Sequence, residues 1–357
     1  MNARIDKLRL FMTEHALDGM LVMKPENRRY FSGFTGSAGA LLVSAQEARL
    51  ITDFRYVVQA EQEASGCEII RHTGTLLDEV HQSANSLKLK TVGFEADYVT
   101  YDLYQTIQSK LPTLQLAGHK LDGLRMVKDN SELTALTQAV KIADQAFTSI
   151  LPYIKPGRTE NEIAMELEYT MKRLGATKAA FDIIVASGIR SALPHGRPTD
   201  KIIQSGDFVT MDFGAVYNGY HSDITRTVVI GKASEKQRTI YDLVLRAQLA
   251  GITAVKPAKS GSEVDKVARQ IIAEAGYGNY FGHGLGHGIG LVIHEDPRLS
   301  PTAPSDLKLQ PGMTITVEPG VYLPDWGGVR IEDSVVVTAA GCDVLTSSSK
   351  QLIEIEY

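Results

Sequence analysis

The sequence predicts an α/β (α+β) protein of two domains, on three observations. The chain has 357 residues, whereas a single domain usually has about 100–200. Residues 1–125 alternate short apolar segments with helical patterns, as α/β domains do. Residues 126–357 contain long helical patterns followed by strand-rich stretches, and this order occurs twice. We therefore expect an amino-terminal α/β domain over residues 1–125 and a second, duplicated domain over residues 126–357.

The composition narrows the class of protein. Lys and Arg number 37 against 42 Asp and Glu, a net charge of −5, so nothing favours binding to nucleic acid or to an anionic membrane. Two cysteines cannot form a disulfide framework and suit a reducing compartment. The first residues lack the apolar run of a secretory signal, and no stretch approaches 18 consecutive apolar residues. We expect a soluble, cytoplasmic protein without nucleic-acid or membrane partners.

In the first domain the elements follow from apolar runs and helical spacing. The runs predict buried strands over residues 20–23, 40–43 and 91–94. The stretches between them predict helices over residues 55–64, 75–84 and 101–111. The glycine-rich segment 33–39 lacks the Lys-Ser/Thr ending of a phosphate-binding loop, which favours a tight turn or a contact loop.

The second domain begins at a polar boundary and contains a repeat. Asp129 and Glu132 have the spacing of a capping box, which predicts a long helix over residues 131–151. IKPGRTENEI at 154–163 aligns with VKPAKSGSEV at 255–264, at an offset of 101 residues. A Lys-Pro turn can recur by chance, but the constant offset favours duplication. Duplicated halves fold about a pseudo-twofold axis, and a site often lies between them.

Two predicted hairpins of this domain carry carboxylates. Residues 208–230 form the first, with Asp212 on one arm, Asp223 on the other and an Asn218-Gly219 turn between them. A strand carboxylate flanked by Val, Ile and Phe is expected in a core, where it is costly unless a cation or a metal compensates it.

The second hairpin repeats the arrangement. Residues 314–337 carry Glu318 on one arm and Glu332 on the other, and we expect the arms to be joined through Gly327-Gly328. One such hairpin per half would bring four carboxylates together, and divalent metals supply the positive charge that four neighbouring anions need.

Histidines near the second hairpin offer nitrogen ligands. Residues 281–295 contain His283, His287 and His294 among five glycines, too many for the helix of an HExxH zinc site. We expect an extended, closely packed backbone that presents imidazoles into a cavity. His195, in a loop bounded by Pro and Gly, is a fourth candidate. A single strand Asp or His is more often structural, but several in matching settings favour a metal site.

The same segments resemble a known family. The run from His283 to Glu295 matches the proline-peptidase signature, and MDFGAVYNGYHSDITRT and VEPGVY…GGVRIED match the flanking motifs. NRRYFSGFTGSAG and ITDFRY are similar to the amino-terminal domain of the same group. The chain thus resembles the pita-bread metallopeptidases of the Xaa-Pro branch, aminopeptidase P and prolidase. The resemblance implies a creatinase-like domain over residues 1–125 and a pseudo-twofold pita-bread domain over residues 126–357.

The resemblance also implies roles for matching residues. Five ligands of a two-metal centre are implied at Asp212, Asp223, His287, Glu318 and Glu332. Catalytic roles are implied for His195, His294 and Glu318, and substrate contacts for His283 and Arg330. Thr225 is expected to support the ligands. Four carboxylates and one imidazole are hard ligands, so two Mn²⁺ ions per chain are expected, with Co²⁺ or Zn²⁺ as alternatives.

Three functions follow as expectations. The first is an Xaa-Pro aminopeptidase, which removes one residue ahead of proline from small proline-containing peptides. The alternative is an Xaa-Pro dipeptidase, restricted to dipeptides. The third is a catalytically inactive peptide-binding module, which would be expected to lose ligands. The resemblance further implies a homodimer.

Overall fold

The protein, here a computed structural model, is described over residues 2–357 and divides into two compact units, Met1–Arg125 and Met126–Tyr357. Each unit combines helices with sheets, which confirms the α/β (α+β) fold class. None of the helices in residues 2–357 combines the length and the hydropathy that crossing a bilayer requires.

The first unit contains a six-stranded mixed sheet in the order β4-β3-β2-β1-β5-β6. Its strands are β1 (Gly19–Val22), β2 (Ala40–Ser44), β3 (Ala48–Thr52), β4 (Glu68–Arg71), β5 (Thr91–Glu95) and β6 (Gln115–His119). Its helices are α1 (Ala3–Glu14), α2 (Pro25–Ser32), α3 (Val57–Glu63), α4 (Leu76–Ser86) and α5 (Tyr101–Lys110). The three predicted strands and three predicted helices are present. Strands β3, β4 and β6 were not predicted; the side chains of β4 and β6 are half-buried or exposed, so these two strands lack the apolar run of a buried strand.

The second unit consists of two similar halves. The first half contains α6 (Asn130–Ile150), α7 (Glu160–Arg173), β8 (Ile184–Ser187), β9 (Phe208–Phe213) and β12 (Ile224–Ile230), and β20 (Glu354–Ile355) completes its sheet. The second half contains α8 (Glu235–Ala254), α9 (Gly261–Glu274), β13 (Gly286–Gly288), β14 (Glu295–Leu299), β15 (Thr314–Val317), β18 (Asp333–Val337) and β19 (Cys342–Val344). Short strands complete the unit: β7 (Lys178–Ala179), β10 (Ala215–Tyr217), β11 (Tyr220–His221), β16 (Gly320–Leu323) and β17 (Gly327–Arg330).

The helices carry the repeat predicted from the sequence. α7 and α9 each have 14 residues, and their first residues, Glu160 and Gly261, are 101 positions apart, as are their last. Both begin with a capping box, and so does α6 at Asp129 and Glu132. The matching bounds and caps support duplication of one half-domain.

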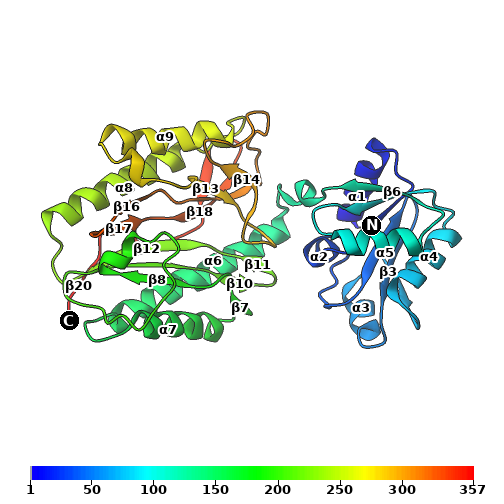
Figure 1. Cartoon of the computed structure of the whole chain (residues 1–357), viewed down its shortest axis with the longest axis horizontal. Coiled ribbons are helices and arrows are strands. Elements are labelled where there is room, and N and C mark those ends of the chain that lie inside the picture. The colour runs from blue at the N-terminus through cyan, green and yellow to red at the C-terminus, as the bar shows by residue number, and fades with distance from the viewer. Residues whose placement is uncertain (1) are drawn as a thin grey trace. The chain divides into compact units, whose positions relative to one another are not determined.

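Each half has its own apolar core. α8 and α9 pack on the strands of the second half, and α6 and α7 pack on β8, β9 and β12. Figure 1 shows α8 and α9 above the strands and α7 below them. The strands that carry the predicted metal ligands therefore lie between two helical layers, away from solvent.

The turn of the second hairpin differs from the expectation. Gly327 and Gly328 do not form the turn but begin β17, where they pair with Leu323 and Tyr322 of β16. The turn lies at residues 324–326 instead. Gly328 is required at a close approach, since a Cβ there would lie 2.4 Å from the Ser191 carbonyl oxygen of the other half. The glycine pair therefore serves packing between the halves and not chain reversal.

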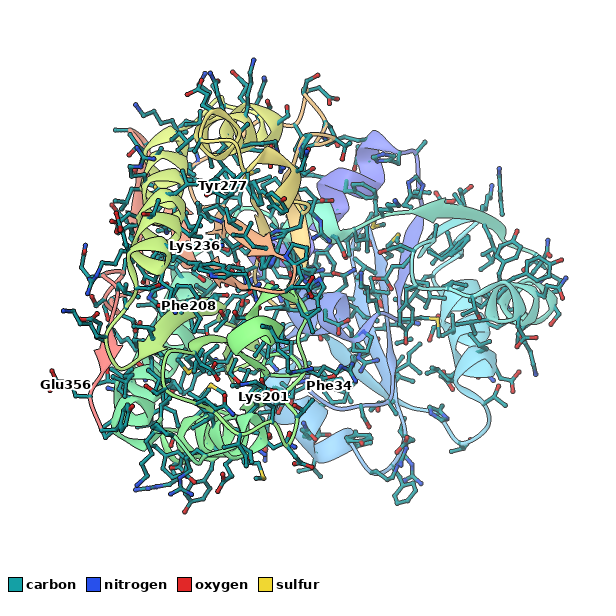
Figure 2. All side chains as sticks on the ribbon, turned by 60° about the vertical axis from the view of Figure 1, so that its left-hand side comes forward. Phe34, Lys201, Phe208, Lys236, Tyr277 and Glu356 are labelled. Carbon is teal, nitrogen blue, oxygen red and sulfur yellow. The ribbon has the colours of Figure 1, made fainter. Side chains whose placement is uncertain are left out.

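Trp326, the chain's one tryptophan, closes this turn. Phe208 meets its ring edge to face at 5.8 Å, and the Lys236 ammonium lies 4.3 Å from its centroid. Figure 2 labels both contacting side chains. Because β9 begins at Phe208, this contact ties the turn of one half to the first ligand-bearing strand of the other.

Candidate metal centre

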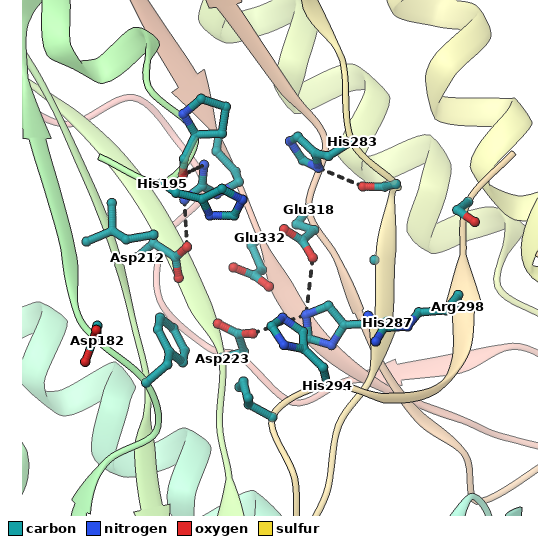
Figure 3. Close-up of a pocket in the computed structure, with 18 of the residues that line it drawn as sticks. Asp182, His195, Asp212, Asp223, His283, His287, His294, Arg298, Glu318 and Glu332 are labelled. Atoms are coloured by element: carbon teal, nitrogen blue, oxygen red, sulfur yellow. Dashed lines mark hydrogen bonds and ion pairs between the residues drawn. The ribbon is translucent and has the colours of Figure 1, made fainter. Parts of the chain in front are cut away.

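The predicted site residues meet in one cavity of about 640 Å³ in the second unit. All nine line it: Asp212, Asp223, His287, Glu318, Glu332, His195, His294, His283 and Arg330. Figure 3 shows their side chains converging from both halves of the unit. The structure thus brings together residues that are as far apart in sequence as His195 and Glu332.

The first hairpin positions two carboxylates as predicted. β9 and β12 are antiparallel with Asp212 opposite Thr225, and Asp223 immediately precedes β12. Asn218 and Gly219 both have positive φ, 45° and 76°, as the tight turn requires. The first arm of the hairpin is divided into β9 and β10 at Gly214, where a Cβ would lie 1.8 Å from the Ser222 carbonyl oxygen.

The second hairpin positions the other two carboxylates. β15 and β18 are antiparallel, with Val317 opposite Asp333. Glu318 follows Val317 and Glu332 precedes Asp333, so both carboxylates leave the sheet at the same end. The ends of the two hairpins that carry the carboxylates therefore both line the same cavity.

The glycine-rich strand supplies the imidazole. His287 lies in β13, which pairs with β14 on one side and β15 on the other. A Cβ on Gly286 would lie 2.0 Å from the Thr316 carbonyl oxygen, and one on Gly288 would lie 2.2 Å from that of Asp296. Only glycines on both sides allow so narrow a strand, which confirms the predicted extended, close-packed backbone.

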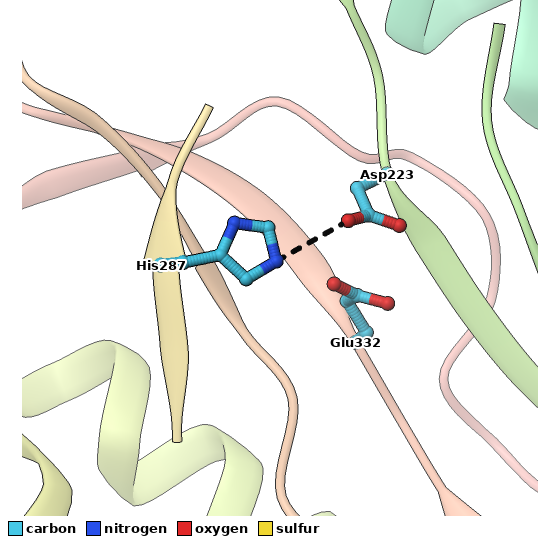
Figure 4. Close-up of side chains that lie close together, drawn as sticks. All are labelled: Asp223, His287 and Glu332. Carbon is cyan, nitrogen blue, oxygen red and sulfur yellow. Dashed lines mark ion pairs between the residues drawn. The ribbon is translucent and has the colours of Figure 1, made fainter. Parts of the chain in front are cut away.

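A backbone contact sets the tautomer of His287. Its Nδ1 lies 2.9 Å from the Gly288 carbonyl oxygen, which can only accept, so Nδ1 carries the proton. Nε2 then presents its lone pair 3.5 Å from Asp223 Oδ2 and 3.4 Å from Glu318 Oε1. Burial lowers the pKa of His287 to about 3, which keeps the ring neutral. Figure 4 shows this ring facing Asp223 and Glu332.

The carboxylates are held without enough positive charge around them. Burial, and then the neighbouring carboxylates, raise the pKa values of Asp223 and Glu332 well above their usual range. Burial also raises the pKa of Glu318 to about 8, although Arg330 opposes the shift. The Arg330 guanidinium is paired with Asp212 at 2.6 Å. One arginine does not balance four carboxylates, so the cluster favours either protons or a bound cation.

The donor set fits divalent metal. Ligand atoms of Asp223, His287 and Glu332 lie within 4.8 Å of one another. Three buried carboxylate oxygens of this cluster accept no hydrogen bond from any donor in residues 2–357. They are Asp212 Oδ1, Asp223 Oδ1 and Glu332 Oε1. Buried carboxylate oxygens without a hydrogen-bond donor are costly, and a hard cation satisfies them. The residues present therefore match a site for divalent cations.

Protons and metal are expected to compete for this cluster. Carboxylates bind cations in the deprotonated form, so binding must release the protons that the raised pKa values retain. The apparent affinity should weaken as the pH falls below about 8, the pKa of Glu318, by roughly tenfold per unit for each proton released. His287 adds nothing above about pH 4, because it is already neutral. Calorimetric titration of chelator-treated protein with Mn²⁺ in buffers of different ionisation enthalpy measures the released protons. An affinity equal at pH 6 and pH 8 would contradict this expectation.

A series of hydrogen bonds links Glu332 of the carboxylate cluster to His283. Thr225 Oγ1 donates to Glu332 Oε2 at 2.7 Å, the supporting contact expected for this residue. Arg330 donates to Thr225 Oγ1 at 3.1 Å and to the Tyr322 hydroxyl at 2.8 Å, and that hydroxyl lies 2.8 Å from His283 Nε2. Tyr322 was not predicted as a site residue, since one tyrosine in a strand is indistinguishable from a core residue.

Two further predicted histidines, His294 and His195, line the cavity. His294 is exposed, and its ring centroid is 4.4 Å from that of His287. His195 is exposed on the loop after β8. Burial lowers the pKa of His294, so the neutral ring predominates at neutral pH.

Several other residues that line the cavity were not predicted either. Asp182 and Arg197 pair at its mouth at 3.0 Å, and Arg298 lines the wall on β14. For Arg298, a signal was available: it lies four residues after His294, so strand alternation places both on one face.

Comparisons with known proteins agree with this geometry. The family model described as "Metallopeptidase family M24" matches residues 134–339. The model described as "Creatinase/Prolidase N-terminal domain" matches residues 4–127. The solved Xaa-Pro dipeptidase from Bacillus anthracis has a TM-score of 0.96 at 48% identity, covering 98% of this chain and 99% of that one. An Xaa-Pro dipeptidase of Pyrococcus furiosus is 41% identical over 99% of this chain and 100% of its own length. The solved X-Pro aminopeptidase of Thermotoga maritima has a TM-score of 0.90 at 42% identity, covering 95% and 98%.

Proposed function

The chain belongs to metallopeptidase family M24, and from that premise we propose that it is an Xaa-Pro dipeptidase. The observation that carries the proposal is similarity over the whole length to proteins named Xaa-Pro dipeptidase, at 41% and 48% identity. This reverses the order expected from the sequence, in which the aminopeptidase came first. The Xaa-Pro aminopeptidase remains the second candidate because of the 42% identical Thermotoga maritima structure. The inactive binding module, which would be expected to lose ligands, is not favoured, because all five expected ligand residues line the cavity.

The proposed centre holds two divalent cations, Mn²⁺ foremost, on four carboxylates and one imidazole. Its ligands would be Asp212, Asp223, His287, Glu318 and Glu332, all of which line the cavity. When bound, such cations acidify water and polarise a carbonyl oxygen. The three buried oxygens without donors and the neutral His287 lone pair support this assignment.

Hydrolysis joins the water oxygen to the scissile carbonyl carbon and breaks the bond to the proline nitrogen. In an Xaa-Pro bond this nitrogen carries no hydrogen, so it must receive a proton as it leaves. Glu318 is proposed to move that proton from water to nitrogen. Its carboxylate lines the cavity, with Oε1 3.4 Å from His287 Nε2, and a carboxylate so placed can accept a proton and then donate it.

Histidines are proposed to stabilise the oxygen of the scissile group. His294 and His195 line the same cavity from separate loops, and a neutral imidazole can donate one N–H to a carbonyl or to the oxyanion that develops from it. His283 is proposed to contact the proline residue, since its Nε2 already meets the Tyr322 hydroxyl at 2.8 Å and is thereby oriented. Arg330 faces the cavity but donates to four protein groups, which supports a mainly orienting role beside any substrate contact.

Arg298 is proposed to select dipeptides. A dipeptide Xaa-Pro carries its free carboxylate on the proline itself, next to the reacting bond, whereas a longer peptide does not. Among residues 2–357 no acidic side chain pairs with Arg298, while Arg197 pairs with Asp182 and Arg330 with Asp212. Arg298 is therefore the arginine of the cavity whose charge is available to that carboxylate.

The deciding experiment compares Xaa-Pro with Xaa-Pro-Xaa peptides in the presence of Mn²⁺. We expect kcat/KM to be higher for dipeptides, and Arg298→Met to lower it for dipeptides by roughly 10–100-fold, the 1.5–3 kcal/mol of a hydrogen-bonded charge. Arg197→Met, which removes a neighbouring arginine already paired with Asp182, is the matched control and should change it little. Faster cleavage of tripeptides by the wild type would favour the aminopeptidase. The homodimer and the cytoplasmic location expected from the sequence stay predictions.

A further inference from the structure

A buried ion pair lies beneath the loop that carries His294. Lys128 Nζ is 3.1 Å from Glu295 Oε2, and the two side chains are 1% and 3% exposed. The partners are 167 residues apart in sequence. Lys128 precedes α6, where its backbone N–H donates to Gly312, and Glu295 begins β14 directly after His294. The pair therefore joins the start of the second unit to the strand that follows a proposed catalytic histidine.

The loop between His287 and His294 packs around this ion pair. The Val292 N–H donates to Glu295 Oε1 at 3.0 Å, which closes the loop on the carboxylate. A Cβ on Gly290 would lie 2.8 Å from Glu295 Oε2 and 3.0 Å from Lys128 Cε. The loop backbone thus packs directly on both charged side chains, with no room for a further carbon atom.

Because side chains alternate along a strand, the position of Glu295 also sets the direction in which His294 points. Along β14 the side chains of Glu295, Pro297 and Leu299 are buried, and those between them are exposed. Glu295 points into the protein, so its neighbour His294 points to the cavity, where its ring meets His287 at 4.4 Å. Movement of the Glu295 carboxylate would rotate or shift the His294 backbone with it.

We propose that the Lys128–Glu295 pair positions His294 for catalysis, an inference that rests on the proposed peptidase function. A buried ion pair is a weak source of stability, because desolvation offsets the attraction between the charges. It is, however, directional: the ammonium and the Val292 N–H hold the two carboxylate oxygens separately. Lys128 and Glu295 are positioning residues, since the contacts described for them are with protein groups.

The first variant is Glu295→Gln, which keeps the shape and an acceptor for Val292 but removes the charge. We expect kcat to fall by about 10²-fold, the effect of misplacing a reacting group by about 1 Å, with KM and metal content nearly unchanged. Asp144→Asn is the matched control: this buried carboxylate accepts bonds from Ser347 and Ser348 and does not line the cavity. It should lower the Tm and leave kcat intact.

A double-mutant cycle separates positioning from general structure. In a His294→Ala background, Glu295→Gln should change kcat by less than about threefold, because both substitutions act through one imidazole. The double variant Lys128→Met/Glu295→Met, an apolar pair of similar volume, should regain a wild-type Tm while kcat stays low. Multiplicative effects of Glu295→Gln and His294→Ala, or wild-type kcat in the apolar double variant, would overturn the inference.

A crystal structure of Glu295→Gln decides the inference independently of activity. We expect the His294 ring to leave its contact with His287, now 4.4 Å between centroids, while the metal ligands keep their places. An unmoved ring would refute the positioning role even if the enzyme were a good prolidase. A displaced ring in a protein without activity toward Xaa-Pro peptides would refute the proposed function and not the positioning contact.

Discussion

Replacing Asp223 or His287 with alanine is expected to abolish peptidase activity and to prevent the protein from retaining metal. Both residues belong to the buried cluster whose ligand atoms lie within 4.8 Å of one another, and both are more than nine-tenths buried. Without either side chain, one ligand fewer would remain to bind the cation. Since the cation accounts for several kcal/mol of transition-state stabilisation, turnover should fall at least about 10³-fold.

Metal analysis and kinetics on the same preparations test this expectation. Each variant should contain less metal than the wild type after dialysis against chelator and reloading with Mn²⁺. Asp144→Asn again provides the control, as a buried aspartate in the same unit outside the cavity. Wild-type turnover by Asp223→Ala or His287→Ala, once trace metal is removed, would refute the ligand assignment.

His294→Ala is expected to retain metal and to lose most of its turnover. The ring lines the cavity and is exposed, and its lowered pKa keeps it a neutral donor at neutral pH. Removing one donor to a developing oxyanion typically costs about 2.7–4 kcal/mol, or roughly 10²–10³ in kcat. KM should change little, because the lost bond is strongest in the transition state.

The measurement must separate this role from metal binding. His294 and His287 are in ring contact, so metal content has to be determined alongside kcat at saturating Mn²⁺. His294→Gln, whose amide can still donate, should recover part of the rate. Metal loss in step with activity would make His294 a ligand and contradict the proposed role.

Local sequence was sufficient for the elements that bear the site. The Asn218-Gly219 turn brings Asp212 of β9 and Asp223, which directly precedes β12, onto adjoining arms, because only residues that tolerate positive φ make so tight a reversal. The capping box of Asp129 and Glu132 begins α6 because both of its bonds are closed within four residues. Such signals depend on near neighbours, so they survive in any tertiary context that permits them.

Contacts between distant segments were beyond that reasoning. Gly327 and Gly328 have the composition of a turn, yet both pair within a strand, and Gly328 is required there because Ser191 approaches its backbone closely. Tyr322 likewise gains a role only in the fold, where its hydroxyl contacts both His283 and Arg330.

The sequence by itself determined which side chains were expected to meet in one cavity, namely the four carboxylates and the glycine-flanked imidazole, and which hairpins hold the carboxylates. Residue type and short-range spacing suffice for this, since ligand chemistry and turn geometry are local properties. Only the tertiary structure decided how these groups are oriented and charged. The raised pKa of Glu318 and the pairing of Lys128 with Glu295 both depend on burial among segments far apart in the chain. Burial and long-range packing are properties of the whole fold, which no local pattern encodes.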